Sequence, residues 1–267
     1  MKLAVLSFVL LLSAAGAFAQ PAGFEKVLFP IVIHPMEQVP GALGSQWVTD
    51  ISVLNLGDVP VPLAGQYWCF FCLTAQPLQR EVTYGSVPVP ARGDIGGSFL
   101  FVDSRYLDQL RFNLRVRDVS REAEGFGSEV PVVRERDFHA NGVSLLGIPN
   151  RSNLRLMLRV YGLDAGGGDV IVRVYEQRTA LIVHLFSTMP VDALVAERTY
   201  TLAQIGTDTL SGVQNFPAYA QIADLPMPST PLARIDIVPL TPGLRIWAFA
   251  SATNNTTQQV TVISPHS

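Results

Sequence analysis

Alternating apolar and polar positions mark the middle of the chain. From Asn153 to Tyr161 every second residue is leucine or valine, and the residues between them are polar or aromatic, with Met157 the exception. Residues two positions apart share one face of an extended strand, so this stretch predicts a strand. The alternation resumes from Asp169 to Glu176 after Gly166-Gly167-Gly168, where glycine permits the chain to reverse. We expect two long neighbouring strands here.

The same alternation predicts short strands along the rest of the chain. Pro30 lacks an amide hydrogen, so the first of these strands is expected to be broken there or to lie at a sheet edge. Asp103 to Leu110 predicts a short helix capped by Asp103 or Ser104, and Ile205 to Pro231 predicts a long connection. The expected strand regions are Val27–Ile33, Trp47–Trp68 (a strand pair), Glu81–Pro90, Leu110–Arg117, Val130–Phe138, Leu181–Leu185, Arg198–Leu202, Ala233–Ile237, Leu244–Ala250 and Gln259–Ile263.

Many short strands with almost no helix predict an all-β protein. A weak internal repeat places Asp50 before Ile51 and Asn153 before Leu154, each at the start of a predicted strand. A period near half the chain length suits two tandem domains rather than a solenoid. We therefore expect two antiparallel β-sandwich domains, at residues 25–145 and 146–267, with the boundary in the turn-rich stretch from 141 to 150.

The N-terminus has the pattern of a secretory signal peptide. Lys2 precedes an apolar run from Leu3 to Leu12, and Ala17-Phe18-Ala19 forms a small-x-small cleavage site before Gln20. The apolar run is shorter than the roughly 20 residues that span a membrane. Residues 1–19 are therefore expected to direct export to the periplasm or the exterior, with no stable membrane insertion after cleavage.

Composition excludes some classes of partner. Hydrophobic residues make up 48% of the chain and charged residues 15%, which is enough to form a core. The net charge of −3 does not favour nucleic acid or an anionic membrane. Arg111, Arg115 and Arg117 alternate with apolar residues and, together with Arg134 and Arg136, could bind an anionic glycan or phosphate, but a solvated sheet face explains them more simply.

Two short patterns resemble a known group of proteins. Gly44-Ser-Gln-Trp-Val-Thr-Asp50 precedes Asn55-Leu-Gly-Asp58, and Arg151-Ser-Asn-Leu154 opens the second half. These features resemble exported bacterial proteins with tandem immunoglobulin-like β-sandwich domains, a group without an assigned activity. The resemblance covers most of the chain and implies the fold and export. It implies no site residues.

Cys69 and Cys72 form the sharpest chemical pattern. A CxxC pair is redox-active when it opens a helix that stabilises the thiolate. Here it follows a predicted strand, so a structural disulfide formed after export is the preferred interpretation, ahead of free thiols and of redox catalysis. Zinc would require further ligands, and the four histidines show no paired spacing. We expect no metal and no cofactor.

The sequence lacks the common catalytic signatures. Neither Gly-x-Ser-x-Gly nor His-Glu-x-x-His occurs. We therefore expect a non-enzymatic structural, adhesive or interaction module of the cell envelope or exterior, with an unknown protein or glycan partner. An extracellular hydrolase with dispersed catalytic residues is the least favoured alternative.

Four aromatic residues suggest a second alternative, a carbohydrate-binding module. Tyr161, Tyr175, Trp247 and Phe249 lie opposite the main apolar faces of their predicted strands. Exposed aromatic rings can stack on sugars or form a partner surface. They can equally form the contact between the two domains, which is the interpretation we place first.

Overall fold

The computed structural model describes residues 22–34, 37–59, 61, 81–83, 95–124, 126–164, 166–177, 192–204 and 216–265. This part of the chain is all-β, with antiparallel sheets and short 3₁₀ turns, which confirms the predicted all-β class. The expected signal peptide, the Cys69 and Cys72 pair and the expected strand Leu181–Leu185 lie outside the described residues.

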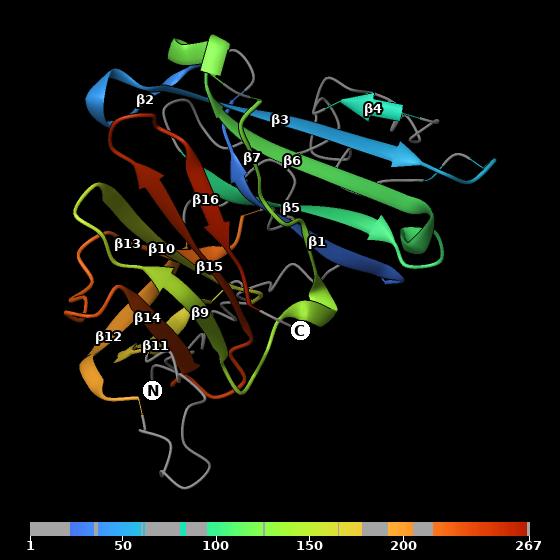
Figure 1. The fold of residues 1–267 in the computed structure, drawn as a ribbon. Coiled ribbons are helices and arrows are strands. Elements are labelled where there is room, and N and C mark those ends of the chain that lie inside the picture. The colour runs from blue at the N-terminus through green and yellow to red at the C-terminus, as the bar shows by residue number, and fades with distance from the viewer. Residues whose placement is uncertain are drawn as a thin grey trace, which may run out of the picture.

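Two antiparallel sheets make up the N-terminal half (Figure 1). One has the strand order β5-β1-β8, and the other has the order β2-β3-β6-β7, with β4 paired to β3. The two sheets pack face to face, and Phe29 of β1 meets Phe112 of β6 edge to face with ring centroids 5.7 Å apart. The strands are β1 (Phe24–Val32), β2 (Val39–Pro40), β3 (Gln46–Asn55), β4 (Glu81–Thr83), β5 (Gly96–Asp103), β6 (Leu110–Asp118), β7 (Ser128–Glu129) and β8 (Val133–Arg134).

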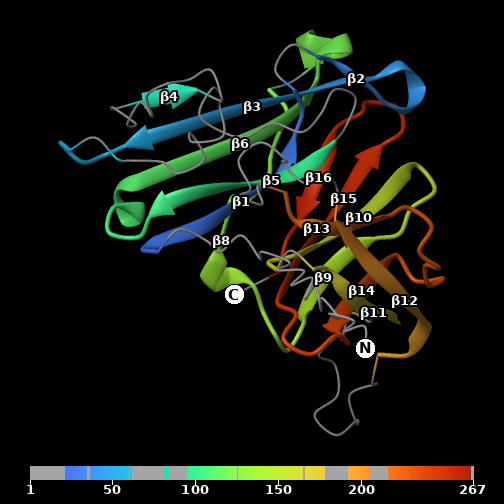
Figure 2. The same ribbon diagram turned by 180° about the vertical axis from the view of Figure 1, so that it is seen from behind.

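One antiparallel sheet of eight strands makes up the C-terminal half (Figure 2). Its order is β16-β15-β10-β13-β12-β11-β14-β9. The sheet curls until β9 lies against β15 and β16, so apolar side chains on its inner face enclose a separate core. The strands are β9 (Val143–Pro149), β10 (Leu154–Gly162), β11 (Gly168–Glu176), β12 (Leu194–Gln204), β13 (Ala218–Ile222), β14 (Leu232–Pro239), β15 (Ile246–Asn254) and β16 (Val260–Ile263).

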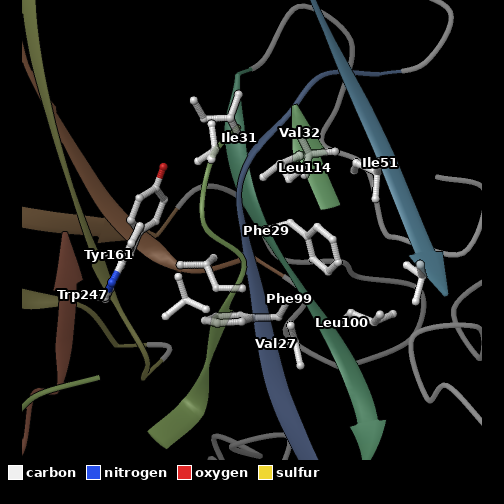
Figure 3. Packing of buried hydrophobic residues seen from close by; sticks show 14 of the residues in the cluster. Val27, Phe29, Ile31, Val32, Ile51, Phe99, Leu100, Leu114, Tyr161 and Trp247 are labelled. Atoms are coloured by element: carbon white, nitrogen blue, oxygen red, sulfur yellow. The ribbon is translucent and has the colours of Figure 1, made fainter. Parts of the chain in front are cut away.

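The alternation in β10 and β15 separates two cores. Leu158 and Ala248 face the interior of the C-terminal half, whereas Tyr161, Trp247 and Phe249 belong to the core of the N-terminal half. Strand β5 is buried along its whole length, and β1 along its last six residues. The β5-β1-β8 sheet is therefore a middle layer, covered on one face by β3 and β6 and on the other by the C-terminal half, as Figure 3 shows.

The prediction that the two central strands are neighbours is wrong. Strand β10 pairs with β13 and β15, whereas β11 pairs with β12 and β14. Leu158 of β10 and Val172 of β11 instead contribute to the same core. The connecting turn contains Gly167 at φ 64°, where an added Cβ would lie 2.1 Å from the Leu202 carbonyl oxygen. This turn carries the chain across the core rather than into a hairpin.

Several predicted boundaries differ from the structure. The boundary after residue 145 falls inside β9, which pairs with β14 of the C-terminal half, because the chain turns earlier, at Gly142 with φ 97°. Val130–Phe138 is not one strand. Pro131 interrupts the ladder, and only β7 before it and β8 after it are paired, each in a different sheet. The expected connection Ile205–Pro231 contains the unpredicted strand β13.

The helix expected from Asp103 to Leu110 is a single 3₁₀ turn, η4. The Asp103 carboxylate accepts a hydrogen bond from the Arg105 amide at 3.0 Å, which fixes a tight turn instead of a helix cap. Such local hydrogen bonds compete with helix formation. The short 3₁₀ elements are η1 (Ala42–Gly44), η4 (Leu107–Gln109), η5 (Val119–Glu124) and η6 (Glu135–Asp137).

Pro30 breaks the regular pairing of β1, as predicted, although β1 lies between β5 and β8 rather than at the edge of its sheet. The register of β1 against β5 shifts between Phe29 and Val32, and β8 pairs only with Val27 and Leu28. A bulge tolerates a residue without an amide hydrogen. The bulge also leaves the Pro30 carbonyl free to accept a hydrogen bond from the other half of the molecule.

Candidate ligand-binding cleft

Three of the four aromatic candidates are buried and offer no surface for a ligand. Tyr161 and Phe249 are fully buried, and Trp247 is 5% exposed. Their rings pack together and onto Tyr219, with the Tyr161 centroid 5.7 Å from Tyr219 and 6.3 Å from Phe249. The alternative of an exposed aromatic surface is therefore wrong for these three residues, and the interpretation placed first, a contact between the two halves, is confirmed for them. Alternation distinguishes two faces of a strand, but here the C-terminal half buries one face and the N-terminal half buries the other.

Tyr161 links the two halves through a polar contact as well. Its hydroxyl donates a hydrogen bond to the Pro30 carbonyl at the bulge of β1. Burial raises the pKa of Tyr161 to about 12, while the nearby Arg159 guanidinium acts in the opposite direction. The hydroxyl therefore stays protonated and keeps its role as a donor.

Tyr175 is separate from this cluster. It lies on β11 and is half-buried, and the Arg234 guanidinium covers its ring at 4.3 Å from the centroid. Arg234 is held there by ion pairs with Asp192 at 2.5 Å and Asp236 at 3.3 Å. The structure thus does not bring the four predicted aromatic residues together into one site.

A cleft of about 580 Å³ lies between the two halves. Strands β1, β3 and β6 form one side of it, and strands β10, β13, β15 and β16 form the other. Its volume lies in the range of small-molecule sites. Most of its walls are apolar, and the larger contributors include Ile31, Ile95, Val130, Met157, Phe249 and Val262.

Arginine supplies all the ionisable side chains on the described walls of this cleft, at Arg151, Arg155 and Arg159. These residues are four positions apart, so β10 and the turn before it present them on one side. Their exposure falls along the strand, because Arg151 is exposed, Arg155 is intermediate and Arg159 is only 6% exposed. The cleft is therefore mainly apolar and positively charged, with the Arg159 side chain almost fully buried.

Arg155 and Arg159 differ in how their guanidinium groups are satisfied. Arg155 donates to the side-chain oxygens of Asn255 and Gln258, both at 2.7 Å. Arg159 lies against the Tyr161 hydroxyl, but its Nη1 is buried without a hydrogen-bond partner. An unsatisfied charged donor in an apolar setting is unfavourable and marks a place where a ligand can contribute the missing acceptor.

The arginines that the sequence suggested as an anion-binding face differ from Arg159 in their partners. Arg117 contacts Asp50 at 2.6 Å, and Arg115 lies 3.7 Å from Glu129. These arginines stand on a partly solvated sheet face and have carboxylate partners, as in an ordinary sheet surface. The sequence shows only that Arg159 lies on the strand face opposite the leucines of β10. That no described carboxylate pairs with it depends on the tertiary structure.

A second contact between the two halves, outside the cleft, is polar. The Lys26 ammonium donates to the Leu163 carbonyl at 3.1 Å, and the Lys26 amide donates to Glu135 at 3.3 Å. Arg245 reaches the other oxygen of Glu135 at 3.3 Å. Burial lowers the pKa of Lys26, and the nearby carboxylates of Asp164 and Glu135 partly oppose that shift.

No protein-family model, curated protein or solved structure matches the chain. Within the described ranges, no group of three or more His, Cys, Asp or Glu side chains is arranged to hold a metal ion. Among the same residues, no helix has the length and hydropathy needed to cross a membrane. The cleft and its arginines are therefore the features from which a function can be argued.

Proposed function

We propose that this chain is an exported, non-enzymatic protein of two immunoglobulin-like β-sandwich halves that works as a binding module of the cell envelope or exterior. Its ligand occupies the cleft between the halves. Export is supported by the signal-peptide pattern of residues 1–19. The binding role is supported by one observation above all, an apolar cleft of about 580 Å³ with an enclosed, unsatisfied arginine.

The chemistry of the cleft supports binding rather than catalysis. Arginine is a poor proton donor because it stays charged at physiological pH. General acid–base or nucleophilic catalysis usually uses His, Asp, Glu, Cys, Ser or Lys in defined pairs. Ser128 and Ser251 line the cleft, but no described lining residue is a histidine or a carboxylate that could activate them.

The binding role is tested by filling the cleft. Ala223 is exposed and lines the cleft, so Ala223→Trp places a large side chain there without disturbing the core. Ala203, an exposed residue of β12 that does not line it, supplies the matched control Ala203→Trp. The protein from Gln20 to Ser267 is screened by thermal shift against anionic, neutral and cationic amphiphiles and soluble oligosaccharides.

We expect at least one compound to raise the melting temperature of the parent and of Ala203→Trp, but not that of Ala223→Trp. Binding that survives in Ala223→Trp would place the site elsewhere. A panel without any stabilising compound would contradict a small-molecule role for the cleft.

A further inference from the structure

We propose that the cleft binds a single-chain amphiphile through its carboxylate, with Arg159 as the receptor for that group. This inference rests on the proposed binding function and names the chemical class of the ligand. The carboxylate binds the Arg159 guanidinium, after a side-chain shift that opens the buried, unpartnered Nη1 to the cleft, and the apolar chain lies against the walls that both halves supply.

The first argument is the missing partner of Arg159. Several other partly buried arginines have carboxylate partners, such as Arg134 with Glu25 at 3.0 Å and Arg234 with Asp192 at 2.5 Å. Arg159 is more deeply buried than either of these, and no carboxylate among the described residues pairs with it. A buried guanidinium is normally paired, since taking an uncompensated charge out of water is strongly unfavourable.

The second argument is the charge of the lining. None of the described lining residues is acidic, so nothing in the cleft competes with an anion for Arg159. Arg155 adds positive potential, although amide oxygens of Asn255 and Gln258 already occupy its guanidinium. Only one donor group of this guanidinium, Nη1, lacks a partner, which suits the two oxygens of a carboxylate better than the three oxygens and about two charges of a phosphate monoester near pH 7.

The third argument is the mainly apolar character of the remaining lining. Apolar residues such as Ile31, Ile95, Met157 and Phe249 outnumber the neutral polar ones, so the many hydroxyl and amide groups of a sugar or a polar peptide would lose more bonds to water than the lining replaces. The neutral polar lining residues are Ser128, Asn150, Gln221, Ser251 and Thr253. An alkyl or aryl chain gives up no hydrogen bonds when it lies against apolar walls, and its transfer out of water is favourable. An apolar body with one carboxylate therefore fits both parts of the cleft.

The test compares four ligands that share a ten-carbon chain: decanoate, 1-decanol, decyltrimethylammonium and decyl phosphate. Isothermal titration calorimetry is run on the parent, on Arg159→Met, on Arg159→Lys and on Arg173→Met. Arg173 lies outside the cleft on β11 and pairs with Glu197 at 2.7 Å, so its loss is a matched control for removing one arginine. Circular dichroism verifies that each variant is folded.

We expect decanoate to bind one to one and at least about tenfold more tightly than 1-decanol. Arg159→Met should abolish that preference while 1-decanol still binds, and it should raise the melting temperature of the unliganded protein because it removes an unpaired buried charge. Arg159→Lys should keep part of the preference, since it retains the charge but not the planar fork. Arg173→Met should bind like the parent.

Three sets of results would overturn the inference. Equal binding of decanoate and 1-decanol, or a preference that survives in Arg159→Met, would show that Arg159 is not the receptor, although the cleft would still be a binding site. Tighter binding of decyl phosphate than of decanoate would assign the head group to phosphate instead. Failure of all four ligands, together with a silent thermal-shift panel, would remove the proposed function itself.

Discussion

Replacing Tyr161 by alanine tests the packing that holds the two halves together. The side chain is fully buried, stacks on Tyr219 and Phe249, and donates a hydrogen bond to the Pro30 carbonyl of the other half. Truncating a buried aromatic ring costs about 3–5 kcal/mol, and an unsatisfied buried carbonyl adds about 1–3 kcal/mol. A loss of roughly 4 kcal/mol or more is a large share of the ~5–15 kcal/mol by which folded domains are stable.

Tyr161→Phe separates the two contributions. It keeps the ring and removes only the hydroxyl, so it should cost about 1–3 kcal/mol through the hydrogen bonds that the hydroxyl makes with the Pro30 carbonyl and with the Arg159 guanidinium. Tyr175→Ala is the matched control, since Tyr175 is half-buried on β11 and its distinctive contact is the Arg234 guanidinium over its ring. Losing that contact should cost about 0.5–2 kcal/mol.

The assay is urea unfolding followed by circular dichroism and tryptophan fluorescence. Both signals should give one coincident transition in the parent, because the N-terminal core includes residues of both halves. Tyr161→Ala should move the midpoint far more than Tyr175→Ala. Equal shifts for the two variants, or two separate transitions in the parent, would refute the reasoning that the Tyr161 cluster joins the halves into one folding unit.

Three further changes test the packing, the first two at the contact between the halves and the third within the N-terminal half. Gly97→Ala would place a Cβ 2.8 Å from the Tyr161 ring, so it should cost about 1–3 kcal/mol in urea unfolding, and much less in a Tyr161→Ala background. Burial lowers the pKa of Lys26 from 10.5, so the unfolded chain binds that proton more tightly and stability should rise with pH in the window below 10.5; Lys26→Met should lack this rise when melting temperatures are compared between about pH 8 and 10. Arg134→Met leaves the half-buried Glu25 unpaired and should cost about 1–3 kcal/mol by thermal melting, with recovery on adding Glu25→Gln.

Much of the strand content could be predicted from the sequence. The alternation in β6, β10, β14 and β15 is regular, and in each case residues of the predicted apolar face are buried. Strand β13 was missed because Ala218–Ile222 is short and carries two alanines among its five residues. The helix at Asp103 was wrongly predicted because its cap residue forms a turn with Arg105 instead.

The candidate site was harder to predict from the sequence than the strands were. Arg155 and Arg159 were visible opposite the leucines of β10, but so were many other arginines in this lysine-poor chain. What separates Arg159 from them is burial without a carboxylate partner. That property depends on which residues of distant strands meet it, and no local pattern contains that information.

The sequence by itself determined which side chains share a strand face, because the period of an extended chain places alternate residues on opposite sides. Only the tertiary structure decided what covers each face and which strands pair. Tyr161, Trp247 and Phe249 are buried because a second layer packs onto them, and β10 lies across the core from β11 because the turn between them bridges two parts of a curled sheet. Hydrogen bonding between strands is satisfied equally well by many partners, so the choice among them is made by the burial of apolar surface over the whole chain.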